Sequence, residues 1–438
     1  MGETTHTAPA RIVVVGGGVA GLEIASALGK QRHAQIGSVT LVDSDSAHVW
    51  KPMLHTIAAG TRDLAQQQTT YLAQASDAGF AYQPGEMCGL DRAAREVLLA
   101  PIAAPDGREL VPGRRLPYDK LVMAVGSGAN DFGTPGVSEH CFMIDSRLKA
   151  DAFNREIRLR MVQCMTSGEQ LQVAIVGAGA TGVELAAELV QLAESASAYG
   201  ALGEAARFKI VLIEAGARVL PSFAPAISSA TQRRLEALGV TVLTHERVQA
   251  ATAQGYVLSG EGQDRLVPAS LRVWAAGVKA PDFLARLGLA CTRGNQLLVN
   301  GDLQTSDPDV YAVGDCASCT LPGAQQPLPP TAQVAHQQAQ YLIEHLPKVL
   351  QSPHAYSGVG FAYRDFGALV SLAHYDAYGS LGKFGLFNGG VIRGRLAMLS
   401  HLMLYRSHQA RLYGFWRGGL LWLVDVMNAR LRPTIRLD

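Results

Sequence analysis

Two glycine-rich segments of the same kind constrain the fold of this chain more than any other feature of its sequence. The first follows Arg11 and an apolar run at residues 12–15, and it reads Gly-Gly-Gly-Val-Ala-Gly over residues 16–21. The second follows residues 173–176 and reads Gly-Ala-Gly-Ala-Thr-Gly over residues 177–182. After each, apolar side chains recur at helical spacing. A strand, a G-x-G-x-x-G turn and a helix in this order predict a dinucleotide-binding unit, because the glycines let the backbone approach a pyrophosphate.

An acidic residue follows each turn at the end of a second β-rich run. Asp43 comes after residues 38–42, and Glu214 comes after residues 208–213. A carboxylate at this place can accept both ribose hydroxyls of an adenosine and would repel a 2′-phosphate. Glu214 therefore favours NADH over NADPH, although Arg218 nearby weakens that argument. The alternative is that both acids are solvated strand ends. Two dinucleotide sites in one chain most simply hold a flavin and a nicotinamide.

Size and composition narrow the remaining classes. A chain of 438 residues is long enough for two or three domains. The formal net charge of +1 gives no indication of nucleic-acid binding. No run of 18 or more apolar residues is present, so we expect no spanning helix. Residues 1–10 lack a basic start and an apolar stretch, so we expect no signal peptide and a cytoplasmic location.

The six cysteines are scattered, which suits a reducing compartment. Cys316 and Cys319 form a C-x-x-C, which has three interpretations: a redox pair, half of a metal site, or two reduced thiols without a catalytic role. No second C-x-x-C or Cys/His pair accompanies it, so the sequence predicts no zinc site, and we expect no metal.

The two halves repeat one plan. Residues 121–127 form an apolar run that ends in small residues, and residues 271–277 are its counterpart after the second turn. Gly314 and Asp315 directly follow a later β-rich run at residues 309–313. An aspartate at this place can bind a hydroxyl group on the ribityl or phosphate side of a flavin. The order of these signals places the nicotinamide half within the flavin half. We therefore predict an α/β fold with two Rossmann-like dinucleotide-binding domains.

Two further segments are informative. Residues 331–343 predict a helix on which Gln333 and Gln337 share a face, a pattern that alone usually means a solvated helix. Residues 390–438 contain eight arginines against two acids, with apolar and aromatic residues interleaved. Such a segment can lie on an anionic membrane, form a homodimer interface or be a buried helix with basic edges. The pattern alone does not separate these alternatives.

On these motifs the chain resembles the type II NADH dehydrogenases, the single-subunit, non-proton-pumping NADH:quinone oxidoreductases of bacterial respiratory membranes. The resemblance runs nearly end to end. Besides the glycine turns, it rests on residues 48–60 with their Trp-Lys-Pro, residues 124–132, residues 314–319, the glutamine helix at 332–337 and the basic tail. The Trp-Lys-Pro form is most similar to the enterobacterial-type respiratory enzyme. The resemblance implies a disulfide-reductase-like flavoprotein fold that ends in an amphipathic, membrane-binding segment.

The resemblance implies site residues at matching positions. For FAD they are Gly16, Gly18, Gly21, Asp43, Lys51, Met87 (through its backbone), Ala124, Gly314 and Asp315. For NADH they are Gly177, Gly179, Gly182, Glu184, Glu214 and Gly277. Glu184 matches the family's catalytic acid near the nicotinamide and the flavin, the alternative being a carboxylate that complements a helix dipole. Gln333 and Gln337 match the segment that lines the quinone pocket, for ubiquinone or menaquinone.

The expected organisation has four parts. Residues 1–155 are the first part of the FAD-binding domain, 156–290 the NADH-binding domain, 291–360 the second FAD part with the quinone-site helix, and 361–438 the membrane-anchoring region. The resemblance also implies peripheral, monotopic binding to anionic lipid on the cytoplasmic face of the inner membrane, often as a homodimer.

Three other classes share parts of this pattern. A pyridine-nucleotide disulfide reductase needs paired redox cysteines, and residues 40–60 contain none. A sulfide:quinone reductase needs cysteines flanking the flavin and does not require NADH, so the intact second turn with Glu214 counts against it. A flavoprotein with an interaction role, like apoptosis-inducing factor, does not explain the match to the quinone segment.

Overall fold

The computed structural model describes residues 9–31, 33–198, 208–259, 264–352, 359–384 and 387–431. The chain forms two compact units, each assembled from three segments. The first unit comprises Met1–Trp50, Gln68–Gly128 and Lys279–Tyr363. The second unit comprises Lys51–Gln67, Ala129–Val278 and Arg364–Asp438. The chain therefore crosses between the units five times, and two of these crossings fall within β12 (Gly128–Ala129) and β21 (Val278–Lys279).

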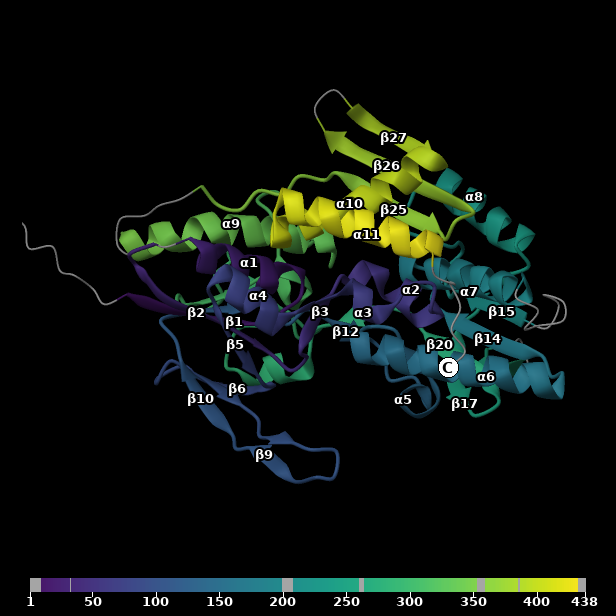
Figure 1. The fold of residues 1–438 in the computed structure, drawn as a ribbon, viewed down its shortest axis with the longest axis horizontal. Helices are drawn as coiled ribbons and strands as arrows, with labels where there is room; N and C mark the ends of the chain where they lie inside the picture. Colours follow the sequence, from purple (N-terminus) through teal and green to yellow (C-terminus); the bar gives the residue numbers. More distant parts are fainter. Residues whose placement is uncertain are drawn as a thin grey trace, which may run out of the picture. The chain divides into compact units, whose positions relative to one another are not determined.

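A parallel five-stranded sheet organises the first unit (Figure 1). In the order in which they pair, its strands are β23 (Val310–Ala312), β11 (Lys120–Met123), β1 (Ala10–Val15), β2 (Ile36–Asp43) and β5 (Ala81–Pro84). The chain thus returns to this sheet through β23 after completing the second unit's sheet. The helices of this unit are α1 (Val19–Lys30), α4 (Tyr71–Ala78) and α9 (Ala332–Gln351), with 3-10 helices η3 (Asp282–Arg286) and η4 (Gly314–Cys316).

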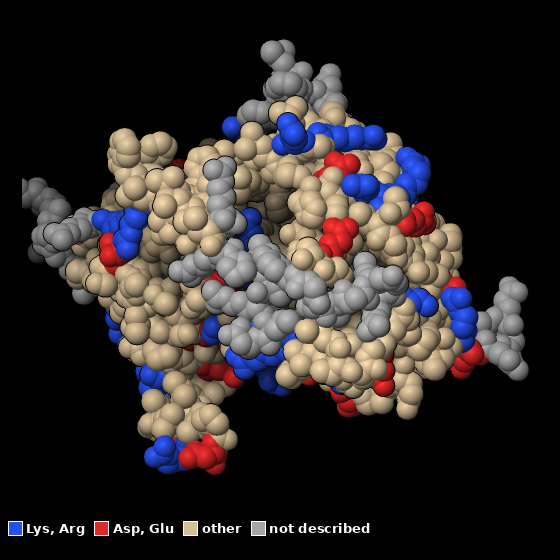
Figure 2. All heavy atoms as spheres, turned by 45° about the vertical axis from the view of Figure 1, so that its right-hand side comes forward, with Lys and Arg blue, Asp and Glu red and all other residues tan. Residues whose placement is uncertain are grey.

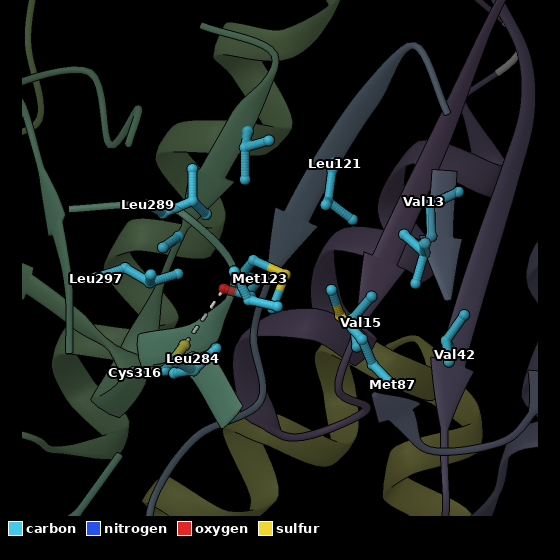
Figure 3. Packing of buried hydrophobic residues seen from close by; sticks show 14 of the residues in the cluster. Val13, Val15, Val42, Met87, Leu121, Met123, Leu284, Leu289, Leu297 and Cys316 are labelled. Carbon is cyan, nitrogen blue, oxygen red and sulfur yellow. Dashed lines mark hydrogen bonds between the residues drawn. The ribbon is translucent and has the colours of Figure 1, made fainter. Parts of the chain in front are cut away.

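Smaller sheets complete the first unit. They are an antiparallel sheet of β10 (Arg114–Pro117), β7 (Glu96–Leu99) and β6 (Met87–Asp91), and the pairs β3 (Ala47–Val49) with β4 (Gln68–Thr70), β8 (Ile102–Ala103) with β9 (Glu109–Val111), and β22 (Leu297–Val299) with β24 (Ala317–Cys319). Branched and sulfur-containing side chains of β1, β2 and β11 pack against leucines of the returning segment and form the core shown in Figure 3. Branched apolar residues at consecutive positions are typical of a parallel strand that is buried on both faces.

The second unit is built on the same plan. Its parallel sheet has the order β13 (Phe142–Met143), β20 (Leu271–Trp274), β14 (Leu171–Val176), β15 (Phe208–Ile213) and β16 (Thr241–Leu243). Its helices before residue 240 are η1 (Lys51–Met53), α2 (Leu54–Ala59), α3 (Leu64–Gln67), α5 (Val137–His140), α6 (Arg147–Ser167), α7 (Ala180–Ala198) and α8 (Pro225–Ala237). An antiparallel sheet of β17 (Val248–Thr252), β18 (Gly255–Leu258) and β19 (Arg265–Pro268) belongs to it as well.

The two parallel sheets share one arrangement around their glycine turns. In each, the strand before the turn lies third in the order, between the acid-ended strand and the strand that ends in small residues. This is the doubly wound α/β arrangement, and it confirms the prediction of two Rossmann-like domains.

The C-terminal segment of the second unit contains a three-stranded antiparallel sheet and two helices. The strands are β25 (Gly367–Leu372), β26 (Asp376–Phe384) and β27 (Phe387–Arg393), and the helices are α10 (Arg395–Tyr413) and α11 (Phe415–Leu431). Leu396, Leu399 and Met403 are exposed on α10, and the aromatic side chains Phe415 and Trp416 at the start of α11 are 78% and 83% exposed. Arg432, Arg436 and Asp438 of the basic tail lie outside the described residues, as do residues 1–8.

Two observations bear on the surface. Among the residues that the structure describes, no helix is both long and apolar enough to cross a bilayer. Figure 2 shows basic and acidic side chains interspersed on the face that it presents, with wide areas that carry neither. This face has no large field of a single sign, which agrees with the net charge of +1.

Candidate functional site

The first glycine turn is shaped by backbone contacts that only glycine permits. Gly16 has a φ of +101°, and a Cβ at this residue would lie 2.3 Å from the carbonyl oxygen of Ala124 at the end of β11. A Cβ on Gly21 would lie 1.8 Å from the carbonyl oxygen of Gly16, so α1 packs directly on the turn. Gly18 differs, because nothing lies within 4 Å of its Cβ position. Packing therefore explains Gly16 and Gly21, whereas Gly18 faces open space.

The second glycine turn repeats this geometry. Gly177 also has a φ of +101°, and its Cβ would lie 2.7 Å from the amide nitrogen of Ala276, just beyond β20. A Cβ on Gly182 would lie 2.0 Å from the carbonyl oxygen of Gly177. Gly179 again has nothing within 4 Å of its Cβ position.

The open positions fit a pyrophosphate. Gly18 is the N-cap residue of α1, and no side chain caps that helix end, whose first turn also carries no acid. Free N–H groups and the positive end of the helix dipole then face the space in front of Gly18, which suits an anion. The residues present therefore fit the phosphates of a dinucleotide, at Gly18 in the first unit and at Gly179 in the second.

Asp43, at the end of β2, is bound to the first turn. Its Oδ2 accepts a hydrogen bond from the amide of Gly17 at 2.5 Å, and its Oδ1 accepts one from the amide of Asp45 at 2.8 Å. Burial raises the pKa of Asp43 above its ordinary value, and these two amides oppose the rise. Asp43 thus orders the glycine turn through its bond to the Gly17 amide.

Glu214, at the end of β15, has the equivalent position in the second unit. Its Oε2 accepts a hydrogen bond from the amide of Ala178 at 2.8 Å, and its Oε1 accepts one from Gly216 at 2.7 Å. Arg218, the nearby cation, donates to the hydroxyl of Ser228 at 2.9 Å and to two backbone carbonyl groups. Because these bonds hold the guanidinium, it is not directed at Glu214, which strengthens the case for a ribose without a 2′-phosphate.

Two side chains that the sequence did not point to hold the first turn from the other side. The hydroxyl of Tyr71 donates to the carbonyl oxygen of Gly17 at 2.9 Å, and Nδ1 of His48 lies 2.9 Å from the same oxygen. Both side chains are buried. A Cβ on Gly17 would lie 2.4 Å from the Tyr71 ring, so this glycine is explained by packing. No sequence motif identifies the pair, because His48 and Tyr71 meet Gly17 only in the folded unit.

The remaining predicted FAD residues fall in different surroundings. Asp315, in η4, accepts a hydrogen bond from the hydroxyl of Ser127 at 2.6 Å, which joins η4 to the loop after β11. Gly314 has a φ of +72°, and its amide donates to the side chain of Gln338 on α9 at 2.7 Å. The Met87 side chain belongs to the core of the first unit, and its backbone lies at the start of β6, paired with Leu99 of β7. Lys51 opens η1 and belongs to the second unit.

Glu184 lies at the centre of a buried polar cluster in the second unit. Its Oε1 accepts a hydrogen bond from the amide of Ser371 at 3.0 Å, and Nε2 of His401 lies 3.8 Å from this oxygen. Nδ1 of His55 lies 3.4 Å from Oε2. Burial raises the pKa of Glu184 to about 8 and lowers that of His55 to about 3. At neutral pH these groups are therefore a protonated acid beside neutral imidazoles.

This cluster bears on the two interpretations of Glu184. A carboxylate that complements a helix dipole is ionised and sits at the solvated end of its helix. Glu184 is buried, protonated at neutral pH and held by residues from α2, β25 and α10. Such a carboxylic acid can give or take a proton near neutral pH, which is the property expected of a functional acid.

A cavity of about 850 Å³ lies beside the Glu184 cluster in the second unit. Segments from residues 53–67, 151–161, 188–192, 371–374 and 395–428 line it, including parts of α10 and α11. Arg62, His401 and Glu188 contribute polar groups, and Thr61 donates a hydrogen bond to Glu188 at 2.5 Å. The volume and the mixed lining suit an amphipathic small molecule.

The glutamine helix α9 begins beside η4 in the first unit. Thr331 caps it by accepting a hydrogen bond from the amide of Val334. Gln333 and Gln337 are half-buried on consecutive turns, and the hydroxyl of Tyr363 lies 3.2 Å from Oε1 of Gln333. Because Gln338 binds Gly314, the predicted quinone helix and the predicted FAD aspartate belong to one connected group.

Cys316 and Cys319 are unsuited to redox chemistry. All six are free thiols, and both Cys316 and Cys319 are buried. Burial raises the pKa of Cys316 to about 11, so its thiol is not ionised at neutral pH. Among the described residues, no group of three or more His, Cys, Asp or Glu side chains forms a metal site.

Comparison with known proteins agrees with this geometry. The model of the pyridine nucleotide-disulphide oxidoreductase family matches residues 10–339. A type II NADH:quinone oxidoreductase from Haemophilus influenzae is 36% identical over 97% of this chain and 99% of its own length. One from Staphylococcus aureus is 28% identical over 84% of this chain and 89% of its own length. In fold, the chain is similar to NDH2 from Plasmodium falciparum in complex with NADH, with a TM-score of 0.83 at 18% identity over 98% of this chain and all of the other.

The two kinds of glycine in the second turn allow a matched test. Gly179→Ala adds a methyl group to open space, so we expect an unchanged melting temperature but weaker NADH binding. Gly182→Ala forces a methyl group onto the Gly177 carbonyl group, so we expect a loss of about 1–3 kcal/mol of unfolding free energy. Thermal unfolding and NADH titration of both variants check this. Equal losses of stability would show that Gly179 is also a packing residue.

The Glu184 cluster predicts a pH dependence of stability. An acid with a pKa of 4.5 when unfolded and about 8 when folded binds more protons in the native state between these values. Its contribution to the unfolding free energy therefore falls as the pH rises through this window, by up to about 1.4 kcal/mol per unit. Denaturant titrations from pH 6.5 to pH 8, above the window between the folded and unfolded pKa values of His55, should show a shallower decline for Glu184→Gln. Glu236→Gln, at an exposed position on α8, is the control, and identical slopes in all three proteins would contradict the raised pKa.

Proposed function

We propose that this chain, which belongs to the type II NADH:quinone oxidoreductase family, transfers hydride from NADH to bound FAD. It then passes two electrons from the reduced flavin to a quinone. The single observation that carries this proposal is the repeated cradle. Two glycine turns with the same φ, the same close contacts and the same open position each have an acid bound to them. A chain that builds this cradle twice is equipped for two dinucleotides.

The first unit is the proposed site of FAD. Gly18 faces the pyrophosphate, Asp43 accepts from the ribose, and Asp315 binds the ribityl side. Gly16, Gly21, Ala124 and Gly314 give the backbone its shape, and the backbone of Met87 completes the proposed set in this unit. Lys51, which belongs to the second unit, stays a prediction from the resemblance. When bound, FAD supplies the hydride acceptor and the carrier of two electrons.

The second unit is the proposed site of NADH. Gly179 faces the pyrophosphate, Glu214 accepts from the adenosine ribose, and Gly177, Gly182 and Gly277 shape the backbone. Glu184 is the proposed catalytic residue, because of the two buried acids of α7 it is the one at the position that the resemblance predicts, and it can exchange a proton near neutral pH. The four domain boundaries drawn from the sequence remain our proposal for the division of these tasks along the chain.

The quinone is the proposed second substrate. In the first unit, Gln333 and Gln337 offer amide groups that can bind a quinone carbonyl oxygen. Ubiquinone and menaquinone share this chemistry. In the second unit, α10 and α11 line the cavity and also expose apolar and aromatic side chains, so this unit has an apolar space next to an exposed apolar surface.

We also propose that α10 and α11 attach the protein to anionic lipid, as a monotopic protein on the cytoplasmic face of the inner membrane. Leu420, Leu423 and Leu431 add to the exposed apolar surface of α11. Arg395 and Arg411 lie near the two ends of α10, and Arg417 lies in the first turn of α11. The guanidinium of Arg417 lies over the ring of Tyr413. Exposed apolar groups with basic neighbours are the features of an interfacial helix. A homodimer is the competing use of this surface.

A sulfide:quinone reductase or a disulfide reductase is the alternative reaction. Both need cysteine thiolates near the flavin, whereas Cys316 and Cys319 are buried and the pKa of Cys316 is raised to about 11. This observation favours the NADH:quinone reaction.

Steady-state oxidation of NADH by the FAD-loaded protein tests the proposal. We expect turnover with a short-chain quinone and none with a disulfide as acceptor or with sulfide as donor. Flavin-containing protein that oxidises NADH with ferricyanide but leaves the quinone unreduced would overturn it. Replacing NADH by NADPH should lower kcat/KM, since Glu214 faces the place of the 2′-phosphate.

The lipid surface has its own test. We expect the double variant Phe415→Ser, Trp416→Ser to lose binding to vesicles that contain anionic lipid, because it removes two of the largest exposed apolar side chains. Flotation of the variant and the wild type measures this, with Phe132→Ser, an exposed aromatic residue outside the tail, as the control. Point variants are preferable to truncation near residue 390, which would cut through β27. Undiminished flotation of the double variant, with a wild type that sediments as a dimer, would favour the dimer interface.

A further inference from the structure

The helix that follows the first glycine turn carries a buried carboxylate. Glu23 lies on α1, and only 4% of the residue is exposed. A carboxylate in such a place needs compensating donors, because its desolvation costs several kcal/mol. Helix α9 offers them, since Nδ1 of His336 lies 2.6 Å from Oε2 of Glu23, and Nε2 of Gln340 lies 3.4 Å from the same oxygen. His336 and Gln340 are four residues apart, so they meet Glu23 from one face of α9.

These contacts lie within the first unit, where α1 and α9 run side by side (Figure 1). On an α-helix, successive residues are rotated by about 100°. His336 is therefore displaced by about 60° from Gln333 and by about 100° from Gln337 around α9. All three side chains are half-buried, and 25% of the His336 side chain is exposed. Gln340, the other residue that contacts Glu23, is displaced by only about 20° from Gln333 toward the side of His336, so the Glu23 contact adjoins the face of the two glutamines.

The contact with Glu23 determines what the imidazole can do. A carboxylate on Nδ1 fixes the ring orientation and the tautomer, so that proton exchange takes place at Nε2. The two ring nitrogens are on opposite edges of the imidazole, so Nε2 is directed away from the buried Glu23. Since the side chain is partly exposed, water can return a proton to it. The pair is a carboxylate–imidazole dyad beside the proposed quinone segment.

We propose that His336, oriented by Glu23, supplies the second proton for quinol formation at the Gln333 and Gln337 face. This inference rests on the proposed function and adds a residue to that site. Glu23 is then a positioning residue, and His336 is the residue that contacts the quinone oxygen.

The proton balance requires such a donor. NADH gives two electrons and one proton as hydride, whereas reduction of a quinone to a quinol takes two electrons and two protons. The Nε2–H bond of protonated His336 breaks as the O–H bond of the quinol forms, and a proton from water restores the imidazolium. The sum is NADH, one proton and quinone on one side, and NAD⁺ and quinol on the other.

Two electron acceptors separate this role from a structural one. Ferricyanide takes single electrons and no proton, so NADH:ferricyanide turnover reports on NADH and FAD alone. We expect His336→Ala to lower kcat with a short-chain quinone at least about tenfold, since general acids typically contribute more than this. Ferricyanide turnover and the FAD content should stay unchanged, and added imidazole should restore the quinone rate. Glu23→Gln should lower the same rate, and Glu344→Gln, at an exposed position of α9, is the matched control.

His336→Gln keeps an amide near Glu23 but cannot transfer a proton, so it should behave like His336→Ala without imidazole rescue. Wild-type quinone turnover in His336→Gln would overturn this assignment and leave the proposed function standing. Loss of FAD together with equal losses of both activities would also overturn it, because the pair would then be structural. A wild-type protein that reduces ferricyanide but no quinone would overturn the proposed function, and this assignment with it.

Discussion

The close contact between the first and third glycine of each turn is the constraint on which both candidate sites depend. In each unit, the helix after the turn approaches so near that a single methyl group would overlap a carbonyl oxygen, at Gly21 and at Gly182. That contact sets the helix end against the strand, and the neighbouring strand end, at Ala124 or Ala276, closes the turn from the other side. The middle glycine is left facing open space with uncapped N–H groups behind it in the first unit. An anion-binding cradle is thus a consequence of how tightly the backbone packs, and it needs no charged side chain.

Carboxylates that are shielded from water are the second theme, and the chain stabilises three of them differently. Asp43 is bound by backbone amides of its own turn. Glu184 is protonated at neutral pH and lies beside neutral imidazoles, because burial disfavours every charged form in that cluster. Glu23 takes donors from a helix that comes more than 300 residues later in the chain. An unpaired buried charge is costly. The three solutions therefore give an acid that orders a turn, an acid that can exchange protons, and an acid that orients an imidazole.

The C-terminal helices combine a packed side with an unusually apolar exposed side. Tyr405 and His408 are buried on α10, whereas Leu396 and Leu404 of the same helix are exposed. On α11, apolar side chains are exposed around much of the helix. Large exposed apolar surfaces in a folded protein mark an interaction site. Since α10 and α11 also line the cavity of the second unit, this segment contributes both to the surface and to a candidate substrate space.

The sequence by itself determined the local chemistry: the two glycine turns, the acids 43 and 214, the glutamine helix and the helical, basic tail all have short-range patterns. A turn that requires positive φ or close backbone contact selects glycine whatever the rest of the chain does, so the motif survives in the sequence. The tertiary structure alone decided which distant side chains meet. His48 and Tyr71 on Gly17, Ser127 on Asp315, the histidines beside Glu184, and His336 on Glu23 leave no periodic signal. These contacts depend on the packing of segments that are far apart in the chain, and the pKa of Glu184 depends on burial that the packing creates.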